Sequence, residues 1–458
     1  MKRTLLALAT MMLAFAVQAQ SNQQPKRIQL TAEEKALVES SVDFSFRLFK
    51  ETRGDVNQVI SPLSVTYALG MQNNGAVGMT RQEICQALGF GNTGADGINA
   101  FCRKMLTELP ALDDETKVML SNAIFLNQPR YFLPEFLEIA HTYYDAETQT
   151  RDFHDGETMD VINQWGSDHT MGMIENVLSE TTFNPDAACY LLNAVYFKGV
   201  WTQKFDKEET KDEPFNGKET VPMMHMNDCL LYMDTYDYQA LVLPYGNKAY
   251  RMTVLLPHED KSISNVLATL EAKTWLKEQK WMEEAIVDVK LPRMDITTNV
   301  NLVETMKALG MTSAFNPDLA EFPNFCSSSP YISNMFQTAK IKMDEEGTEA
   351  AAVTVVEDEE GFPSGPYNFH ANRPFLYTIS ERSTGAILFI GQYMGENTVS
   401  DPTGIEGIDN GQLTIDNEEA DIYDLSGRKI NGQSFPLKGV RGSGIYIDGT
   451  SGRKILVK

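Results

Sequence analysis

The spacing of apolar and polar positions switches repeatedly between a helical and a strand pattern along residues 31–396. After Thr31 the pattern is helical, with apolar residues at intervals of three and four: Val38, Val42, Phe46 and Phe49. Short apolar runs, typical of buried strands, occupy 120–126, 191–201, 375–379 and 386–391. These alternations predict a body of mixed α+β structure.

Two helix starts can be predicted from local signals. Val59 and Ile60 form a short strand pattern, followed by Ser61 and Pro62. Proline is common at the first position of a helix, so Ser61 is predicted to cap the helix that follows. The run 80–83, Thr-Arg-Gln-Glu, has the form of a capping box and predicts a second start.

The N-terminus has the features of a secretory signal. Lys2 and Arg3 precede an apolar run at 5–17, and Ala19 ends a small-residue cleavage pattern. The run is too short for a stable membrane anchor, so residues 1–19 are predicted to be a signal peptide that is removed during export. No cysteine follows the run, which argues against a lipoprotein anchor.

Composition narrows the classes of function. A length of 458 residues suggests about three domains of ordinary size, and 42% hydrophobic residues can supply a large core. The formal net charge of −24 argues against a nucleic-acid partner or an anionic membrane surface, because both require a basic footprint.

Catalytic and metal-binding motifs give little support for an enzyme. The chain lacks a G-x-S-x-G elbow, an H-E-x-x-H pair and a phosphate-binding glycine loop. Its five cysteines are scattered, which is not a disulfide framework, and His225 with Cys229 has no second ligand pair. We therefore expect no enzymatic activity, no metal and no cofactor.

The most informative stretch is an acidic turn followed by small and β-branched residues, 344–356, which ends before an acidic run at 357–360 and before Pro363. Such a segment can be an exposed loop and yet fits the interior of a sheet. It resembles the reactive-centre loop of the serpins, whose hinge pattern is matched by Glu345, Gly347, Thr348, Glu349, Ala350, Ala351 and Ala352. The segment Asn372-Arg373-Pro374-Phe375 follows, with a loop about two residues longer than the family's common pattern.

Further blocks resemble the same family. Ser61 and Ser64 match an Ile-Ser-Pro-x-Ser segment, and Asn193 and Trp201 lie in the block 191–201. The resemblance implies that these residues belong to the shutter and the breach, where the central sheet opens to admit the loop. The family usually has a histidine where this chain has Gln337, whose amide can also donate and accept.

The resemblance covers residues 31–396 and implies one serpin domain, with about nine helices, three β-sheets and an exposed reactive-centre loop. It also implies a suicide inhibitor, in which a protease cleaves the loop, is held as an acyl-enzyme, and is dragged along as the loop inserts into the sheet. The partner would be a serine protease of the elastase, subtilisin or chymotrypsin type, or a papain-like cysteine protease, with the inhibitor a monomer. The alternative is a non-inhibitory serpin-like binding protein that is cleaved as a substrate.

If the loop inserts into the sheet, its inward-facing side chains must be of a kind that fits the interior of a strand. Alternate side chains would face the core, and Thr348, Ala350, Ala352, Thr354 and Val356 are small or β-branched, as a strand interior requires. Asp358 is the misfit, because a buried carboxylate is costly unless it lies near the end of the sheet.

Two counts give different positions for the cleaved bond. Counting forward from Glu345 by the family spacing gives Gly361–Phe362, while counting back from Pro374 gives Pro363–Ser364. Pro363 has no N–H and disfavours cleavage beside it, so Gly361–Phe362 is the first choice and Glu360–Gly361 the second.

The C-terminal region differs from the body. Residues 397–420 are rich in Gly, Asp, Asn and Thr and predict a linker. Residues 421–458 contain short strand patterns with Tyr-Asp-x-x-Gly-Arg and Gly-x-Tyr elements, which resemble the sorting module of type IX secretion cargo. That resemblance implies export through the periplasm to the cell surface or the medium; a plain β accessory module is the alternative.

Overall fold

The chain divides into two compact units, Met1–Thr398 and Val399–Lys458, each described here by itself. The computed structural model describes residues 25–395 except 92, 129, 218, 328–329 and 349–363. In the second unit it describes three short strands, β16 (Ile422–Asp424), β17 (Gly444–Asp448) and β18 (Lys454–Val457), which form an antiparallel sheet in the order β16-β17-β18. Short strands were predicted in this region.

Local capping signals begin the first two helices. Thr31 and Glu34 form a capping box at the start of α2 (Ala32–Thr52). Ser61 caps α3 (Pro62–Gly75), since its hydroxyl accepts a hydrogen bond from the N–H of Ser64 and proline occupies the first helical position. Both starts were predicted from the sequence.

The capping box predicted at 80–83 is wrong. Helix α4 (Gly78–Leu88) begins earlier, after Val77, and has no side-chain cap. The Glu83 carboxylate instead accepts hydrogen bonds from the N–H groups and hydroxyls of Thr312 and Ser313, at 2.7–3.1 Å. The Glu83 side chain therefore makes a tertiary contact instead of capping the start of the helix, as the local pattern had predicted.

The remaining helices of the described residues are short or amphipathic. They are α5 (Gly94–Glu108), α6 (Pro134–Tyr144), α7 (Thr158–Asp168), α8 (Ile263–Thr269), α9 (Ala272–Glu278) and α10 (Val303–Ala308), with 3-10 turns η1 (Leu109–Ala111) and η2 (Ser313–Phe315). No helix of the described part of the chain is long and apolar enough to cross a membrane.

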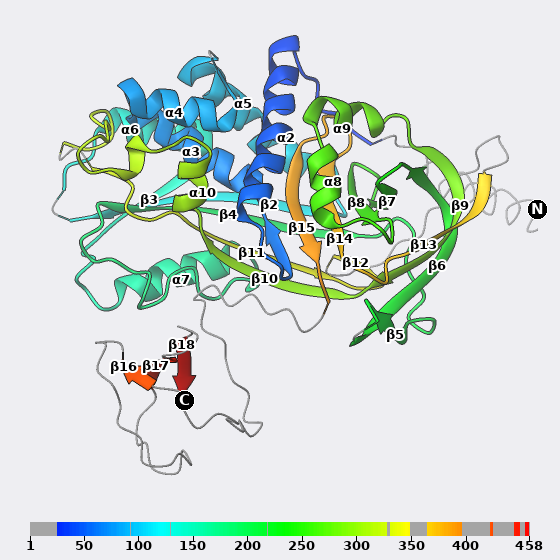
Figure 1. The fold of residues 1–458 in the computed structure, drawn as a ribbon. Coiled ribbons are helices and arrows are strands. Elements are labelled where there is room, and N and C mark those ends of the chain that lie inside the picture. Colours follow the sequence, from blue (N-terminus) through cyan, green and yellow to red (C-terminus); the bar gives the residue numbers. More distant parts are fainter. Residues whose placement is uncertain are drawn as a thin grey trace, which may run out of the picture. The chain divides into compact units, whose positions relative to one another are not determined.

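One sheet is parted into two halves (Figure 1). One half pairs β10 (Met294–Asn301) with β11 (Phe336–Met343), and the other has the order β12-β4-β2-β3. Its strands are β12 (Gly347–Thr348), β4 (Cys189–Val200), β2 (Lys117–Asn127) and β3 (Ala146–Arg151). Within the described residues β4 and β11 form no ladder with each other, so each presents an open edge to the gap between them.

Nine other strands are connected by pairing: eight follow one another in the order β1-β15-β14-β8-β7-β6-β9-β13, and β5 pairs with β6 off this path. The 16-residue strand β6 (Glu219–Asp234) joins two sheets, because its first part pairs with β5 and β9 and its last residues pair with β7. The other members are β1 (Gln58–Ile60), β5 (Lys211–Phe215), β7 (Tyr238–Tyr245), β8 (Tyr250–Pro257), β9 (Glu283–Pro292), β13 (Ser364–His370), β14 (Phe375–Glu381) and β15 (Ile387–Tyr393).

Helices cover both faces of the parted sheet. Helices α3, α4, α5 and α6 gather on one side and α7 lies on the other (Figure 1). A separate apolar cluster fixes α7 to the sheet, with Ile162 and Trp165 of the helix against Phe125, Leu192 and Ala194 of the strands. A strand added to the gap would therefore have to pass beneath α7.

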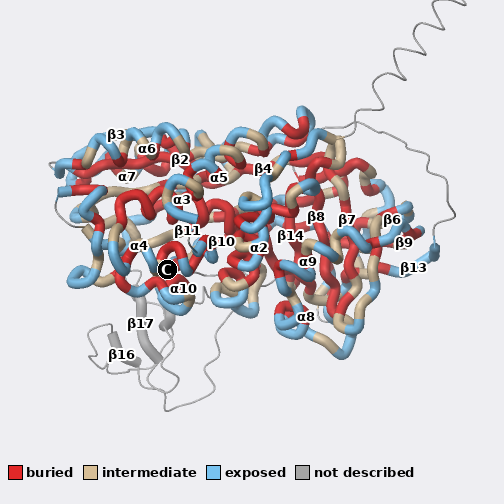
Figure 2. Tube along the Cα trace, turned by 90° about the horizontal axis from the view of Figure 1, so that it is seen from above, coloured by how far each residue is buried: buried red, intermediate tan, exposed pale blue. Residues whose placement is uncertain are grey.

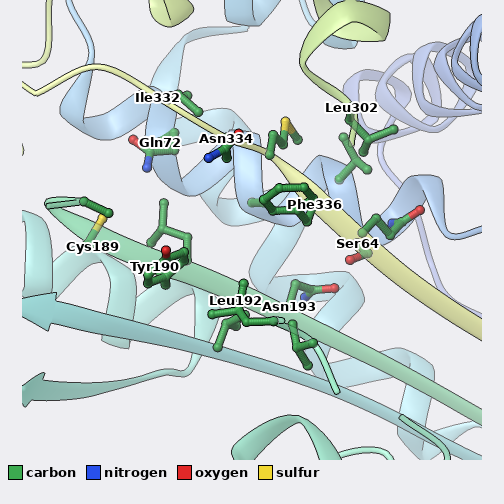
Figure 3. Close-up of a pocket in the computed structure, with 18 of the residues that line it drawn as sticks. Ser64, Gln72, Cys189, Tyr190, Leu192, Asn193, Leu302, Ile332, Asn334 and Phe336 are labelled. Atoms are coloured by element: carbon green, nitrogen blue, oxygen red, sulfur yellow. The ribbon is translucent and has the colours of Figure 1, made fainter. Parts of the chain in front are cut away.

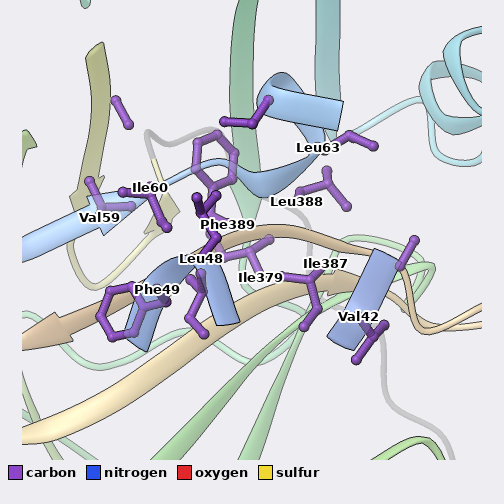
Figure 4. Close-up of a cluster of buried hydrophobic side chains, with 14 of the residues drawn as sticks. Val42, Leu48, Phe49, Val59, Ile60, Leu63, Ile379, Ile387, Leu388 and Phe389 are labelled. Carbon is purple, nitrogen blue, oxygen red and sulfur yellow. The ribbon is translucent and has the colours of Figure 1, made fainter. Parts of the chain in front are cut away.

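The main core lies between α2, α3 and the strands behind them. Strands β8 and β14 are buried along their whole length (Figure 2). Figure 4 shows the apolar side chains that pack between α2 and these strands. They include Leu48 and Phe49 of α2, Ile379 of β14 and Phe389 of β15, which are at most 3% exposed. These buried side chains belong to the main hydrophobic core of the first unit.

Candidate functional site

The hinge lies at the C-terminal end of β11, where the chain turns back through Glu345 and Glu346 into β12. The N–H of Asp344 donates to the Gly347 carbonyl at 2.9 Å, and the Gly347 N–H donates to the Asp344 carbonyl at 3.2 Å. Gly347 then pairs with Val200, and Thr348 with Gly199, in an antiparallel ladder with β4. The first two residues after the turn thus already occupy the gap between β4 and β11.

Gly347 is required by its backbone conformation. Its φ is 143°, a region that side chains disfavour, and a Cβ atom there would lie 2.2 Å from the carbonyl oxygen of Gly199. Only glycine brings the turn this close to β4.

Thr348 faces the core. It is 2% exposed, and its Oγ1 lies 2.9 Å from the hydroxyl of Tyr245. The Tyr245 ring stacks on Trp201 with 4.3 Å between the ring centroids. A small polar side chain fits this pocket, and a long or charged one does not.

Two glutamates fasten the hinge turn. Glu345 is 1% exposed, and its carboxylate accepts hydrogen bonds from Thr210 and from the Arg293 guanidinium, which approaches to 2.6 Å. Glu346 forms ion pairs with Lys204 at 2.6 Å and Lys207 at 2.9 Å. Glu345 thus ties the turn to Arg293, between β9 and β10, and to Thr210, just before β5, while Glu346 ties it to the loop after β4.

These contacts shift the acidity of both carboxyls. Burial by itself raises the pKa of Glu345, but the hydrogen bonds from Arg293 and Thr210 outweigh it, so the pKa falls below its ordinary value of 4.5. Hydrogen bonds from Lys204 and Lys207 lower the pKa of Glu346.

Acid should therefore loosen the hinge. Because both folded-state pKa values are lowered, the stabilisation is complete above the ordinary value of 4.5 and is lost as the pH falls below it. We expect the melting temperature to fall between about pH 5 and 3, and to fall less in Arg293→Gln, in which the Glu345 pair is absent. Melting curves against pH test this. Lys307→Gln, at an exposed ion pair with Glu304, is the control, and an equal effect there would contradict the assignment.

Trp201 holds the turn from the β4 side. Its indole N–H donates to the Asp344 carbonyl at 2.9 Å, and its backbone N–H donates to the Glu346 carbonyl at 2.9 Å. The sequence analysis placed Trp201 where the loop enters the sheet. In the structure it contacts the hinge directly.

The predicted shutter residues form two separate pairs. Gln337 of β11 donates its amide to the carbonyl of Ser61 at 2.7 Å and accepts from the Ser61 N–H at 3.1 Å. Asn193 of β4 donates to Asn122 at 2.8 Å. Asn193 Oδ1 is buried without a hydrogen-bond partner among the described residues. Within the described residues no hydrogen bond joins the side chain of Gln337 to that of Asn193, so each half of the sheet is held separately.

Asn122 was missed by the sequence analysis. It is 1% exposed, and its amide donates to the carbonyl of Tyr144, at the end of α6, at 2.6 Å. An asparagine in the apolar run 120–126 was the available signal, because a buried amide needs partners.

A cavity of about 150 Å³ opens where the two halves of the sheet separate (Figure 3). It is lined by Leu192 and Asn193 of β4, by Ile332 and Phe336 of the opposite segment, and by Ser64 of α3. All of its lining side chains are uncharged. The part of the gap between Asn193 and Phe336 is thus open and lined by uncharged side chains, as the entry of an uncharged strand requires.

Several predicted residues lie outside the described part of the chain. These are Glu349, Ala350, Ala351 and Ala352 of the hinge, and Glu360, Gly361 and Phe362 around the predicted cleaved bond. His225 and Cys229, weighed as metal ligands, lie on β6, and His225 Nε2 is 2.8 Å from Glu213 Oε1. The described residues contain no group of three or more His, Cys, Asp or Glu side chains that could hold a metal ion.

Comparison with known proteins identifies the family. The model of the family described as "Serpin (serine protease inhibitor)" matches residues 39–395. The chain is a serpin. Human Serpin B3 is 32% identical over 389 residues, covering 78% of this chain and 99% of the relative. The leukocyte elastase inhibitor of Xenopus tropicalis is 32% identical over 378 residues, covering 76% and 97%.

Solved serpin structures confirm the predicted fold. The native state of the thermophilic serpin tengpin superposes with a TM-score of 0.73 at 28% identity, covering 82% of this chain and all of that one. Human thyroxine-binding globulin complexed with thyroxine gives 0.71 at 28% identity, covering 79% and 98%. The serpin fold of nine helices, α2 to α10 in the described residues, and three sheets is thus confirmed. Serpins act as inhibitors rather than as catalysts.

Proposed function

We propose that this serpin is a secreted suicide inhibitor of proteases, whose loop is cleaved, traps the acyl-enzyme and inserts between β4 and β11. The observation that carries the proposal is the hinge. Gly347 and Thr348 already pair with β4, while the rest of the gap has two open strand edges. A serpin whose hinge side chain was bulky or charged could not occupy this position.

The same pairing gives the register that an inserted loop would take. Continuing residue by residue from Thr348 and Gly199, position 354 falls opposite Asn193, and continuing the turn along β11 places it beside Gln337. Thr354 would face the core there, and its hydroxyl could donate to Asn193 Oδ1, which lacks a partner. The unsatisfied amide of the resting protein therefore supports insertion as a later state.

Energies are sufficient for the mechanism. About a dozen new ladder hydrogen bonds, at a net ~1 kcal/mol each, give on the order of 10 kcal/mol. The free energy of unfolding of a typical protein is roughly 5 to 15 kcal/mol. The free energy gained by insertion is therefore large enough to distort a trapped protease.

For the target we keep the sequence-based proposal. Cleavage at Gly361–Phe362 puts glycine before the bond and suits an elastase- or subtilisin-like serine protease or a papain-like enzyme, whereas a chymotrypsin-like enzyme would suit cleavage after Phe362. Glu360–Gly361 is the second choice. The leukocyte elastase inhibitor among the relatives supports the first of these classes. Removal of residues 1–19, export through the periplasm, sorting by the 421–458 module and a monomeric state belong to the same proposal.

A protease panel tests the function. The mature protein is incubated with chymotrypsin-, elastase-, subtilisin- and papain-like enzymes, and the products are examined on denaturing gels with mass analysis of the released C-terminal fragment. We expect a gel-stable complex with at least one serine protease and a fragment beginning at Phe362. Cleavage by every enzyme with none retained or silenced would overturn the inhibitor.

Cleavage of the loop without trapping of any protease would favour a non-inhibitory binding protein that is cleaved as a substrate. The similarity to thyroxine-binding globulin, which was solved with thyroxine bound, is the observation behind this alternative. The buried small side chain of Thr348 favours the inhibitor instead.

A further inference from the structure

Helix α7 and the segment that follows it, residues 169–178, pack together as one lid on a face of the parted sheet (Figure 1). The side chain of Asn163 in α7 accepts a hydrogen bond from the N–H of Leu178 at 2.8 Å and donates to its carbonyl at 2.9 Å. Gly166 brings the helix so close to the segment that a Cβ atom there would lie 2.3 Å from Cγ2 of Val177. Because the two parts are packed this closely, we expect them to move as one body.

The underside of the lid forms one wall of the cavity between the two halves of the sheet. Trp165 and Ile174 line the cavity from the lid, and Leu192 of β4 and Phe336 of β11 line it from the sheet. Trp165 is 5% exposed and belongs to the apolar cluster that packs α7 against β2 and β4. A strand that enters the gap beneath α7 would therefore press on Trp165 and raise this part of the lid.

Glu147 ties the same part of the lid to the far edge of the sheet. It lies on β3, the outermost strand of the half β12-β4-β2-β3, and is opposite Ala123 of β2. Its Oε2 accepts a hydrogen bond from the indole N–H of Trp165 at 3.2 Å, and its Oε1 lies 3.1 Å from Nε2 of His169. One carboxylate thus holds two ring nitrogens that lie one helical turn apart.

Contacts within the lid hold the two rings in position for Glu147. The ring of His169 stacks on that of Trp165 with 4.3 Å between the centroids, and its Nδ1 lies 2.8 Å from the carbonyl oxygen of Trp165. Hydrogen bonds to a carboxylate are stronger than those between neutral groups. The side chain that an entering strand would push is therefore also the side chain that Glu147 holds.

We propose that Glu147 is a positioning residue that latches the lid, and that this latch opens when the loop inserts. The inference rests on the proposed function, because the lid has to rise only if a strand enters beneath it. The contacts of Glu147 stabilise the closed lid and are lost as the strand passes, so they slow insertion. Loss of the latch should therefore speed insertion relative to hydrolysis of the acyl-enzyme.

The division of the serpin between trapping and hydrolysis tests the latch. The ratio of cleaved to trapped serpin is measured on denaturing gels with a protease that the wild type traps. In Glu147→Ala this ratio should fall about fivefold, which is the scale of one net hydrogen bond. His169→Phe keeps a stacked ring without its nitrogens and should act in the same direction. The double variant should differ little from Glu147→Ala, because both changes break the same contact.

Gln164→Ala is the matched control. Gln164 donates to Asp168 at 2.7 Å, also across one turn of α7, but this hydrogen bond lies within the helix and does not reach β3. The control should leave the ratio unchanged. In intact Glu147→Ala, the melting temperature should fall and hydrogen exchange in a peptide that contains residues 158–169 should become faster. A residue with a purely structural role would lower the melting temperature without favouring trapping.

Three results would count against the proposal. An unchanged ratio in Glu147→Ala, even with faster exchange in α7, would show that Glu147 holds the helix but is not released during insertion. An equal fall in Gln164→Ala would assign the effect to the helix itself. Both of these results leave the inhibitor intact. If the wild type traps no protease, the proposed function fails, and the latch fails with it.

Discussion

Thr348→Arg is expected to abolish the gel-stable protease complex while leaving the loop cleavable. Thr348 is 2% exposed and its hydroxyl meets Tyr245 beneath the end of β4, a place with no room or counter-charge for a guanidinium. Burying an unpaired charge costs on the order of 3 kcal/mol or more. A cost of that size slows a step about 100-fold. Hydrolysis of the acyl-enzyme should then be faster than insertion of the loop, so the variant should be cleaved as a substrate.

The measurement is the ratio of trapped to cleaved serpin against the protease that the panel identifies. Thr348→Ser keeps the hydroxyl and is the control that should still trap. The heat stability of cleaved Thr348→Arg should match that of its intact form. Undiminished trapping by the arginine variant would show that insertion does not begin at this residue.

Gly347→Val is expected to release the hinge from β4. The φ of 143° is unfavourable for valine, and a Cβ would lie 2.2 Å from the Gly199 carbonyl oxygen, so the ladder between β12 and β4 cannot persist unchanged. Backbone strain of this kind costs on the order of 1–3 kcal/mol. Thr348 should leave its buried position, and the melting temperature should fall.

Hydrogen exchange in a peptide that contains residues 340–348 is the direct measurement. Wild-type amides of this turn should be protected, and those of the valine variant should exchange rapidly. Gly156→Val is the matched control, because a Cβ at Gly156 has no atom within 4 Å. Equal protection in Gly347→Val and wild type would contradict the pairing of the hinge.

The sequence predicted those parts of the structure that depend on local signals. The starts of α2 and α3 were predicted from Thr31 and Ser61, and strands β2 and β4 from their apolar runs. The serpin fold followed from blocks of matching residues. The exception was the run 80–83, where Glu83 had the right spacing for a cap but was taken by a contact more than two hundred residues away.

Features that depend on strand register could not be predicted from the sequence. The insertion of Gly347 and Thr348 beside β4 and the pairing of Asn193 with Asn122 both arise from which residues face one another between distant segments. Gln337 illustrates the difference. The sequence showed an amide in place of the family's usual histidine, but its partner, the backbone of Ser61, became visible in the structure. The cleaved bond stays a prediction.

The two-residue turn at Glu345 and Glu346 also bears on speed. Forming a hairpin from an unstructured chain takes roughly 1–10 μs. Here the turn and two pairs exist before any protease arrives. A typical enzyme completes a catalytic cycle in about 0.1 s, so forming the first contacts of the inserted strand is several orders of magnitude faster than hydrolysis. The slow event in trapping would then be the displacement of α7 and the movement of the attached protease, rather than the search for the first contact.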